Sequence, residues 1–263
     1  MRPPNPVPSA RRPWCGRQAR ALLLALPILG ACASQQENTT KEPDNASRLR
    51  VAAVAEASGQ LDVALSLYAA AAAAAPDQPD VQARLASALA RAGRTAEAED
   101  VLSRALERRR DDPALLMQLG RLRLRAGAAE PALDLFDRVL AVAPDDAAAL
   151  DGRGIALDLA GRHADAQQSY RRALALRPEA VAPANNLAVS LLLSGRVTEA
   201  LTILQPLARR PGAPPRLMAN LAIARAALGD REAAYAILGE GAAREDLDAI
   251  LGSLDGGMAH GAS

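Results

Sequence analysis

The sequence predicts an all-α solenoid of stacked helical hairpins, and two periodic residues support this prediction. Glycine recurs every 34 residues without insertion or deletion, at Gly59, Gly93, Gly127, Gly161, Gly195 and Gly229. Alanine follows the same period, at Ala64, Ala98, Ala132, Ala166, Ala200 and Ala234, which is weaker evidence in an alanine-rich chain. A fixed period of about 20 to 50 residues is typical of proteins in which each unit packs only against its neighbours.

Each repeat is interpreted as two helices joined at the periodic glycine. In residues 147–180, taken as the reference unit, helix A is expected over positions 1 to 14, and Gly161 at position 15 ends it in a left-handed conformation. Helix B is expected from about position 18, and an acid suits its positive end. These acids are Asp62, Glu97, Glu130, Asp165, Glu199 and Glu232. Pro76, Pro144 and Pro178 are expected to end helix B, because proline cannot donate the next hydrogen bond.

Small and bulky residues also recur at fixed positions of the 34-residue repeat. Position 8 carries Ala52, Ala86, Gly120, Gly154, Ala188 and Ala222. Position 24 carries Tyr68, Leu102, Phe136, Tyr170, Leu204 and Leu238. The small residues allow two backbones to approach closely, and the bulky ones fill the space against the next hairpin. Aromatic residues make up only 2% of the chain, so the core is expected to be aliphatic and rich in alanine.

This pattern resembles the tetratricopeptide repeat (TPR) family over six units, residues 45–248. The resemblance implies a right-handed superhelical solenoid, followed by a short cap and tail at 249–263. Repeat 5 departs from the pattern, because Pro206 falls inside its helix B and is expected to kink it. In repeat 2, Arg110 replaces the proline of position 32. Arginines late in helix B, such as Arg171 and Arg172, suit the negative end of the helix or form a binding patch.

Residues 1–31 have the pattern of a signal peptide. They contain five arginines and no acid, and Ala21 to Leu29 are apolar. The ending Leu29-Gly30-Ala31-Cys32 resembles the bacterial lipobox, which implies lipid attachment at Cys32. An ordinary secretory signal with a coincidental cysteine is the alternative. Residues 32–44 are expected to form a lipidated flexible tether, and the alanine after Cys32 resembles that of lipoproteins sorted to the outer membrane, facing the periplasm.

Charge and cysteine content exclude several functional classes. Without residues 1–31 the chain keeps 26 basic and 30 acidic residues, which gives no concentrated basic composition for binding nucleic acid. Cys15 lies in the signal and Cys32 is used by lipid, so no disulfide is expected. His163 and His260 have no partner at motif spacing and are expected to be exposed. The sequence therefore predicts no catalysis, cofactor or metal site.

The TPR resemblance implies that helix A positions 2, 5, 6, 9, 12 and 13 line a concave groove that binds protein segments. The candidate groove residues are Arg121, Leu124, Ile155, Asp158, Asn185, Asn186, Val189, Leu192, Asn220 and Ile223. The asparagine amides could bond an extended peptide backbone. Alternatively, they bond neighbouring helices within the stack.

Residues 185–238, together with the lipobox, resemble the TadD family of repeat lipoproteins in Flp or tight-adherence pilus assembly. The segment Gln205-Pro206 and the Pro-Gly-Ala-Pro-Pro loop at 211–215 contribute most to this resemblance. It implies a non-catalytic scaffold that helps a secretin or another pilus component to localise or assemble. An envelope adaptor that recruits cell-wall hydrolases or proteases to the membrane is the alternative, and the sequence does not separate the two.

Overall fold

The computed structural model describes residues 44–238 and Leu247. The chain divides into two units, Met1–Glu42 and Pro43–Ser263, and every described element belongs to the second. The predicted signal peptide at 1–31, the lipid-bearing Cys32, nearly all of the tether and the tail at 249–263 lie outside the described residues, as does His260.

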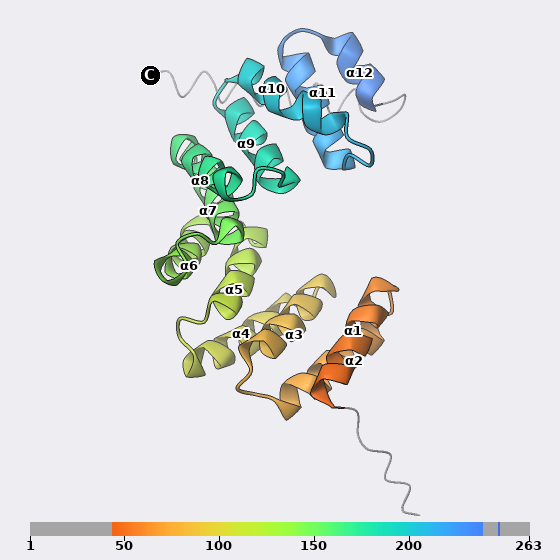
Figure 1. The fold of residues 1–263 in the computed structure, drawn as a ribbon, viewed down its shortest axis with the longest axis vertical. Coiled ribbons are helices and arrows are strands. Elements are labelled where there is room, and N and C mark those ends of the chain that lie inside the picture. Colours follow the sequence, from red (N-terminus) through yellow and green to blue (C-terminus); the bar gives the residue numbers. More distant parts are fainter. Residues whose placement is uncertain (1–43, 239–246, 248–263) are drawn as a thin grey trace, which may run out of the picture. The chain divides into compact units, whose positions relative to one another are not determined.

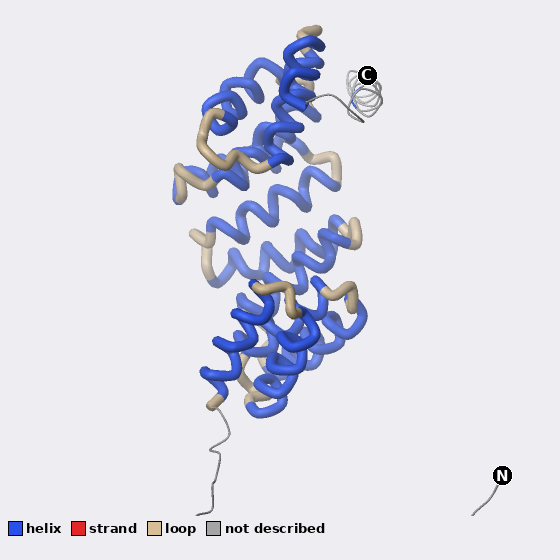
Figure 2. Tube along the Cα trace, turned by 90° about the vertical axis from the view of Figure 1, so that its right-hand side faces the viewer, coloured by secondary structure: helices blue, strands red, loops and turns tan. Residues whose placement is uncertain are grey.

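The described part of the chain consists of twelve α-helices and no strand (Figure 1). Short loops join them, as Figure 2 shows. The helices A are α1 (Asn45–Ala57), α3 (Pro79–Arg91), α5 (Pro113–Arg125), α7 (Ala147–Leu159), α9 (Val181–Leu193) and α11 (Pro215–Ala227). The helices B are α2 (Leu61–Ala74), α4 (Thr95–Arg108), α6 (Ala129–Val142), α8 (His163–Leu176), α10 (Val197–Ala208) and α12 (Arg231–Leu238). Helices A begin every 34 residues, so the predicted all-α repeat architecture is confirmed.

The periodic glycines end the helices A by their backbone conformation. Their φ angles lie between 70° and 86°, in the left-handed region. In the fourth repeat Gly161 donates its N–H to the Asp158 carbonyl at 3.0 Å, and Arg162 donates to the Leu157 carbonyl at 2.8 Å. This pair of bonds is a Schellman motif, which satisfies carbonyls at the helix end. A Cβ on Gly161 would meet nothing within 4 Å, so the requirement is conformational and not steric.

The ends of the helices B correct one expectation. α8 ends at Leu176, two residues before Pro178, and Arg177 between them has φ −137° and ψ 80°. Proline restricts its preceding residue to such extended conformations. However, Arg109 has φ −137° and ψ 77° in repeat 2, where Arg110 follows it instead of proline. The prolines therefore fit this ending, but they do not cause it.

Helix α10 runs from Val197 to Ala208 with Pro206 inside it. Pro206 has no N–H to donate, and because it lies in the last turn the missing hydrogen bond affects only the end of the helix. Helix α10 has 12 residues, whereas α8 has 14. The following loop contains Gly212 at φ 73°, and α11 then begins in register. The departure from the repeat pattern is thus absorbed in the loop before α11.

Arginines near the ends of helices B hold the loop of the preceding repeat. Arg172 donates from Nη2 to the Pro144 carbonyl at 2.7 Å and to Asp145 at 3.1 Å. One repeat earlier, Arg138 makes the same two contacts with the Arg110 carbonyl and Asp111. These arginines therefore do more than compensate a helix dipole, because they connect successive repeats.

The core is made of alanine, leucine and a few aromatic residues, and it falls into two main clusters that meet at α5. Leu115 and Leu122 belong to the cluster that continues into α1 to α4. Leu116 and Met117, on the same helix, belong to the cluster that continues through α6 to α11. Since consecutive helices pack against one another along the chain, α5 connects both halves of the stack.

Candidate functional groove

A groove of about 840 Å³ lies along the helices A of repeats 3 to 6. Helices α5, α7 and α9 and the start of α11 form its walls, and Tyr170 of α8 also lines it. Seven of the ten predicted groove residues line it, namely Arg121, Leu124, Ile155, Asp158, Asn185, Asn186 and Val189. The structure therefore brings most of the candidate site together.

Three predicted residues do not line this groove. Leu192 is only 5% exposed and packs in the core, which corrects its placement. Asn220 and Ile223 lie on α11 beyond the groove lining. The sequence prediction also missed Arg125, Asp151, Leu159, Leu193 and Arg216, which line the groove. All five occupy positions 2, 5 or 13 of their repeats, so the family rule for groove positions could have identified them.

The asparagines of helices A bond from one repeat to the next. Asn186 Nδ2 donates to Asp151 Oδ1 at 2.9 Å, and Asn220 Nδ2 donates to Asn185 Oδ1 at 2.9 Å. Each bond connects consecutive helices A. The geometry thus agrees with the alternative in which these amides hold the stack together, and Asn185 itself is 7% exposed.

Asp151 places a carboxylate in the middle of the groove wall. Burial raises the pKa of Asp151 above its ordinary value, while the Asn186 hydrogen bond and the Arg121 charge lower it by less. The net direction is upward, so the fold disfavours the ionised form of this group.

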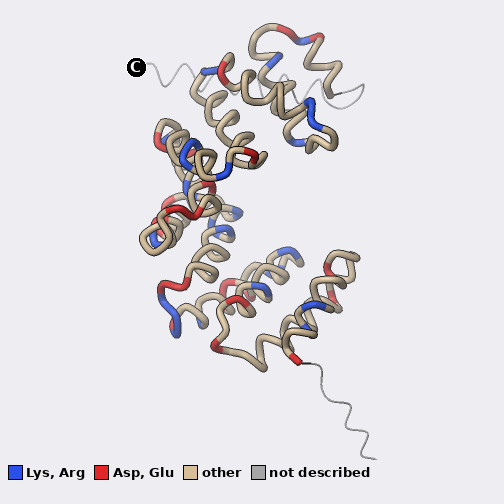
Figure 3. Tube along the Cα trace, viewed as in Figure 1, with Lys and Arg blue, Asp and Glu red and all other residues tan. Residues whose placement is uncertain are grey.

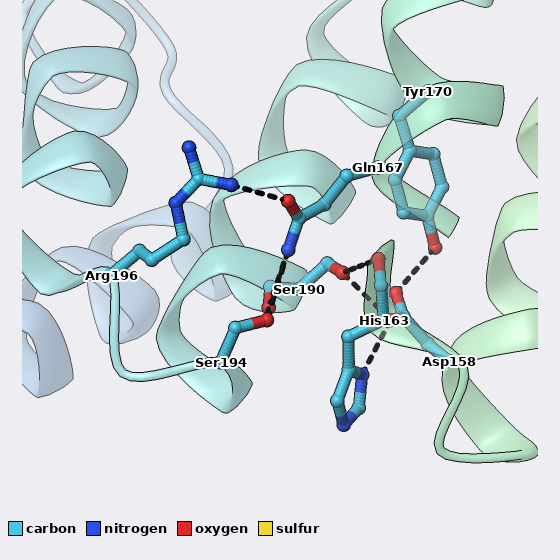
Figure 4. A network of polar contacts seen from close by, with 7 residues as sticks. All are labelled: Asp158, His163, Gln167, Tyr170, Ser190, Ser194 and Arg196. Carbon is cyan, nitrogen blue, oxygen red and sulfur yellow. Dashed lines mark hydrogen bonds and ion pairs between the residues drawn. The ribbon is translucent and has the colours of Figure 1, made fainter. Parts of the chain in front are cut away.

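Asp158, which lines the groove, is the centre of a polar network (Figure 4). Its Oδ1 lies 2.8 Å from His163 Nδ1 and accepts the Ser190 hydroxyl at 2.7 Å, while its Oδ2 accepts the Tyr170 hydroxyl at 2.9 Å. Burial, followed by the Asp158 charge, raises the pKa of Tyr170, which keeps the phenol a donor. His163 is half-buried and bonded, and the expectation that it is exposed is therefore wrong.

The network continues toward repeat 5. Gln167 donates to Ser194 Oγ at 2.9 Å and accepts a bond from Arg196 Nη1 at 2.7 Å. Gln167 and Ser190 are almost fully buried, at 3% and 0% exposed. Since buried polar groups are costly unless bonded, these contacts fix how α8 meets α9.

The network contains the residue types of a hydrolase triad without its geometry. In a triad the serine hydroxyl bonds the imidazole and the acid bonds its other nitrogen. Here Ser190 and His163 both bond Asp158, and the serine contact with His163 is to its backbone carbonyl at 3.4 Å. The arrangement therefore connects repeats and does not activate a nucleophile.

The described residues lack two further kinds of feature. They contain no cluster of three potential metal ligands. Among them, no helix has both the length and the apolar character needed to cross a bilayer. Acidic and basic segments interleave along the helices in Figure 3.

Comparisons with known proteins agree with the repeat architecture. The tetratricopeptide repeat family model matches residues 55–117, 89–153 and 159–217. No curated protein matches the chain. Among solved structures, a thermophilic TPR protein of Thermus thermophilus is 25% identical with a TM-score of 0.60, and the match covers 68% of this chain and 98% of that one.

Two other solved structures share the fold at lower identity. PilF of Pseudomonas aeruginosa is 16% identical with a TM-score of 0.61, covering 73% of this chain and 88% of that one. PilW, described as a widely conserved type IV pilus biogenesis factor, is 19% identical with a TM-score of 0.66, covering 73% and 90%.

Proposed function

Since this chain belongs to the tetratricopeptide repeat family, we propose that it is a non-catalytic scaffold that holds protein segments in its groove during assembly of a pilus or secretion apparatus. The observation that carries the proposal is the groove of about 840 Å³ on α5, α7, α9 and α11. Its lining combines apolar side chains with a few polar groups, as binding sites generally do. Stacked hairpins present such a surface to their partners.

Two observations favour a pilus apparatus of the Flp/Tad type. Residues 185–238 resemble the TadD repeat lipoproteins, which implies a role in localising or assembling a secretin. A structure of the same fold, PilW, is described as a type IV pilus biogenesis factor. The shared fold supports a scaffold of this general kind, and the secretin is the specific partner of the proposal.

The proposed location is the outer membrane, on its periplasmic side. Cys32 follows an apolar stretch with the spacing of a lipobox and would carry the lipid. Diacyl modification supplies more than one hydrocarbon chain, which anchors a protein durably. The polar residues after Cys32 would then separate the repeats from the membrane surface.

Site-specific photo-crosslinking in cells that make the protein tests the proposal. A crosslinker at Leu193, which lines the groove and is 41% exposed, reports groove partners, and one at the exposed Gln168 of α8 is the matched control. Capture of a secretin or pilus component at Leu193 alone supports the proposal. Capture of cell-wall hydrolases or proteases alone replaces it with the adaptor function, and capture only at Gln168 moves the binding face away from the groove.

A further inference from the structure

The groove has arginines at both ends. Arg121 and Arg125 extend from α5 at one end, and Arg216 extends from the start of α11 at the other. Helices α5, α7, α9 and α11 follow one another in contact, so these arginines lie on opposite sides of the central helices α7 and α9. All three side chains are exposed, and among the described residues none has a carboxylate at ion-pair distance, although the Arg121 charge acts on Asp151.

Unpaired arginines are notable because many others in the described repeats have carboxylate partners. Arg153 pairs with Asp137 at 2.6 Å, and Arg196 pairs with Glu199 at 2.6 Å. Arg123, between the two groove arginines of α5, pairs with Glu99 at 2.9 Å. The arginines at the ends of the groove have no such close carboxylate partner among the described residues, so their exposed guanidinium groups can contact a bound molecule.

The two carboxylates inside the groove are already engaged within the protein. Asp158 takes part in hydrogen bonds with His163, Tyr170 and Ser190, so its charge is satisfied by internal partners. Asp151 accepts the Asn186 amide, and it also lies within the influence of the Arg121 charge. The exposed charged side chains at the two ends of the groove are arginines.

The middle of the groove is apolar. Ile155 and Val189 line it, and Leu159 and Leu193, which also line it, are 52% and 41% exposed on α7 and α9. Covering the exposed leucines with apolar side chains of a ligand removes apolar surface from water, which favours binding. A complementary ligand would thus be apolar in its centre and negatively charged at both ends.

We propose that this groove binds a segment of another protein in which apolar side chains are flanked on both sides by carboxylates. This inference rests on the proposed function and specifies the chemistry of its partner. The planar guanidinium group of an arginine can form two parallel hydrogen bonds with a carboxylate. Because these arginines lie at the rim of the groove, they should affect the choice of partner and the rate of association.

A second copy of this chain is the competing occupant. Residues 245–255, EDLDAILGSLD, have the same order of acidic and apolar residues. However, Leu247 within that stretch is only 2% exposed and packs in a cluster with Ala222, Ala226 and Ala234. The stack already uses this leucine, which favours a separate protein as the partner.

Fluorescence anisotropy with three labelled peptides tests the proposal on the purified protein. The probe carries leucines and isoleucine in its centre and glutamates at both ends, and its two matched forms carry glutamine or lysine at the ends. We expect the glutamate peptide to bind most tightly and the lysine peptide most weakly. The affinity of the glutamate peptide should fall as the salt concentration rises from about 0.05 M to about 0.3 M, because salt screens the charges at the rim of the groove. Equal binding of all three peptides would overturn the proposal.

Matched arginine variants locate the effect. Arg121→Gln, Arg125→Gln and Arg216→Gln together should weaken the glutamate peptide about tenfold, since exposed ion pairs each contribute modestly. The control variant, Arg110→Gln, Arg177→Gln and Arg209→Gln, removes the same charge from exposed sites outside the groove and should leave the affinity unchanged. An equal loss in both variants would show a non-specific charge effect and contradict the proposal.

Two outcomes separate this inference from the proposed function. If a pilus component crosslinks at Leu193 and the groove arginine variant captures it equally well, the function stands and the charge chemistry is wrong. If the glutamate peptide depends on the groove arginines but no pilus component is captured in cells, the chemistry stands and the function is wrong. A fourth labelled peptide has the sequence of residues 245–255. If it binds more tightly than the glutamate peptide, and dimers crosslinked through Leu193 form, a second copy of this chain replaces the separate protein as the partner.

Discussion

The Tyr68 hydroxyl donates to Glu56 Oε2 at 3.2 Å, across the same two repeat positions that join Tyr170 to Asp158 in repeat 4. Position 24 is tyrosine in repeats 1 and 4, and in both the residue at position 12 is an acid. In the other four repeats position 24 is leucine or phenylalanine, and position 12 is alanine or leucine. The buried phenol and the acid therefore occur together, because a buried hydroxyl requires an acceptor.

Removing the acid of this pair in repeat 4 should destabilise the protein. Asp158→Ala leaves Tyr170, His163 and Ser190 without their shared acceptor, which should lower the free energy of unfolding by about 2 to 3 kcal/mol. The control Asp165→Ala removes an exposed partner of Arg162 and should cost less than about 1 kcal/mol. Urea unfolding followed by circular dichroism measures both. If both variants lose the same free energy of unfolding, the network around Asp158 contributes no more to stability than an exposed ion pair.

Gly154 should resist substitution because of Tyr170. A Cβ at position 154 would lie 2.7 Å from Tyr170 Cζ, so Gly154→Ala should destabilise by about 1 to 2 kcal/mol, although alanine favours helix. Adding Tyr170→Leu removes the obstructing ring. In a double-mutant cycle the two changes should therefore couple favourably by about 1 kcal/mol. Simple additivity of the two costs would contradict this packing account.

Asp151 should make stability depend on pH. Its folded pKa is raised above the ordinary 3.8, so the folded state binds the proton more tightly than the unfolded state does. The free energy of unfolding therefore falls as pH rises from about 3.8 through the higher pKa of the folded state, where Asp151 becomes ionised. Asp151→Asn keeps an oxygen acceptor for Asn186 and should raise the melting temperature near pH 7. The gain should shrink as pH falls toward 3.8, and urea unfolding of both proteins across this pH range measures it. A gain that does not depend on pH would contradict the role of the ionised carboxylate.

Pro178 and Gly161 should differ in tolerance to alanine. Pro178→Ala should change the free energy of unfolding by less than about 1 kcal/mol, because Arg109 and Arg110 form the same helix ending without proline. Gly161→Ala should cost about 1 kcal/mol or more, since φ is 73° there. Thermal unfolding of the two variants compares them directly. A larger loss from Pro178→Ala would show that the proline is essential to the ending.

Cys32→Ser should release the protein from membranes, since the proposed lipid attaches at that sulfur. Cell fractionation followed by immunoblotting measures the redistribution to the soluble fraction. Cys15→Ser, within the predicted signal, is the matched control and should leave the protein with membranes. Unchanged sedimentation of the Cys32 variant would remove the lipoprotein proposal.

The sequence was sufficient for the repeat architecture because its determinants are local and periodic. Gly161 and its equivalents mark the helix ends, and Ala147 and the corresponding residues begin every helix A in register. The groove positions implied by the TPR resemblance, counted along the same period, identified most groove residues, since position in a repeat determines which face a side chain occupies. Sequence reasoning erred where the outcome depended on contacts between repeats.

Leu192 and His163 show that limit. Leu192 has the repeat position of groove residues, but packing of α9 places it in the core. His163 has no partner at a known motif spacing in the sequence, yet the hairpin turn brings it to Asp158. Ser190 of the next repeat bonds the same carboxylate. Packing in three dimensions likewise determines that Arg123 pairs with Glu99 while Arg125 and Arg216 have no ion-pair partner among the described residues. Periodicity alone carries no information on such pairings.

The unbroken register also makes the number of units adjustable. Asp112 and Asp146 cap successive helices A in the same way, each accepting backbone N–H bonds from the second and third residues of the helix. Excision of residues 113–146 would join Asp112 to Ala147 and preserve that cap. A gene encoding this chain could therefore lose or duplicate a whole unit in a single recombination event, changing the reach of the protein without requiring new helix boundaries.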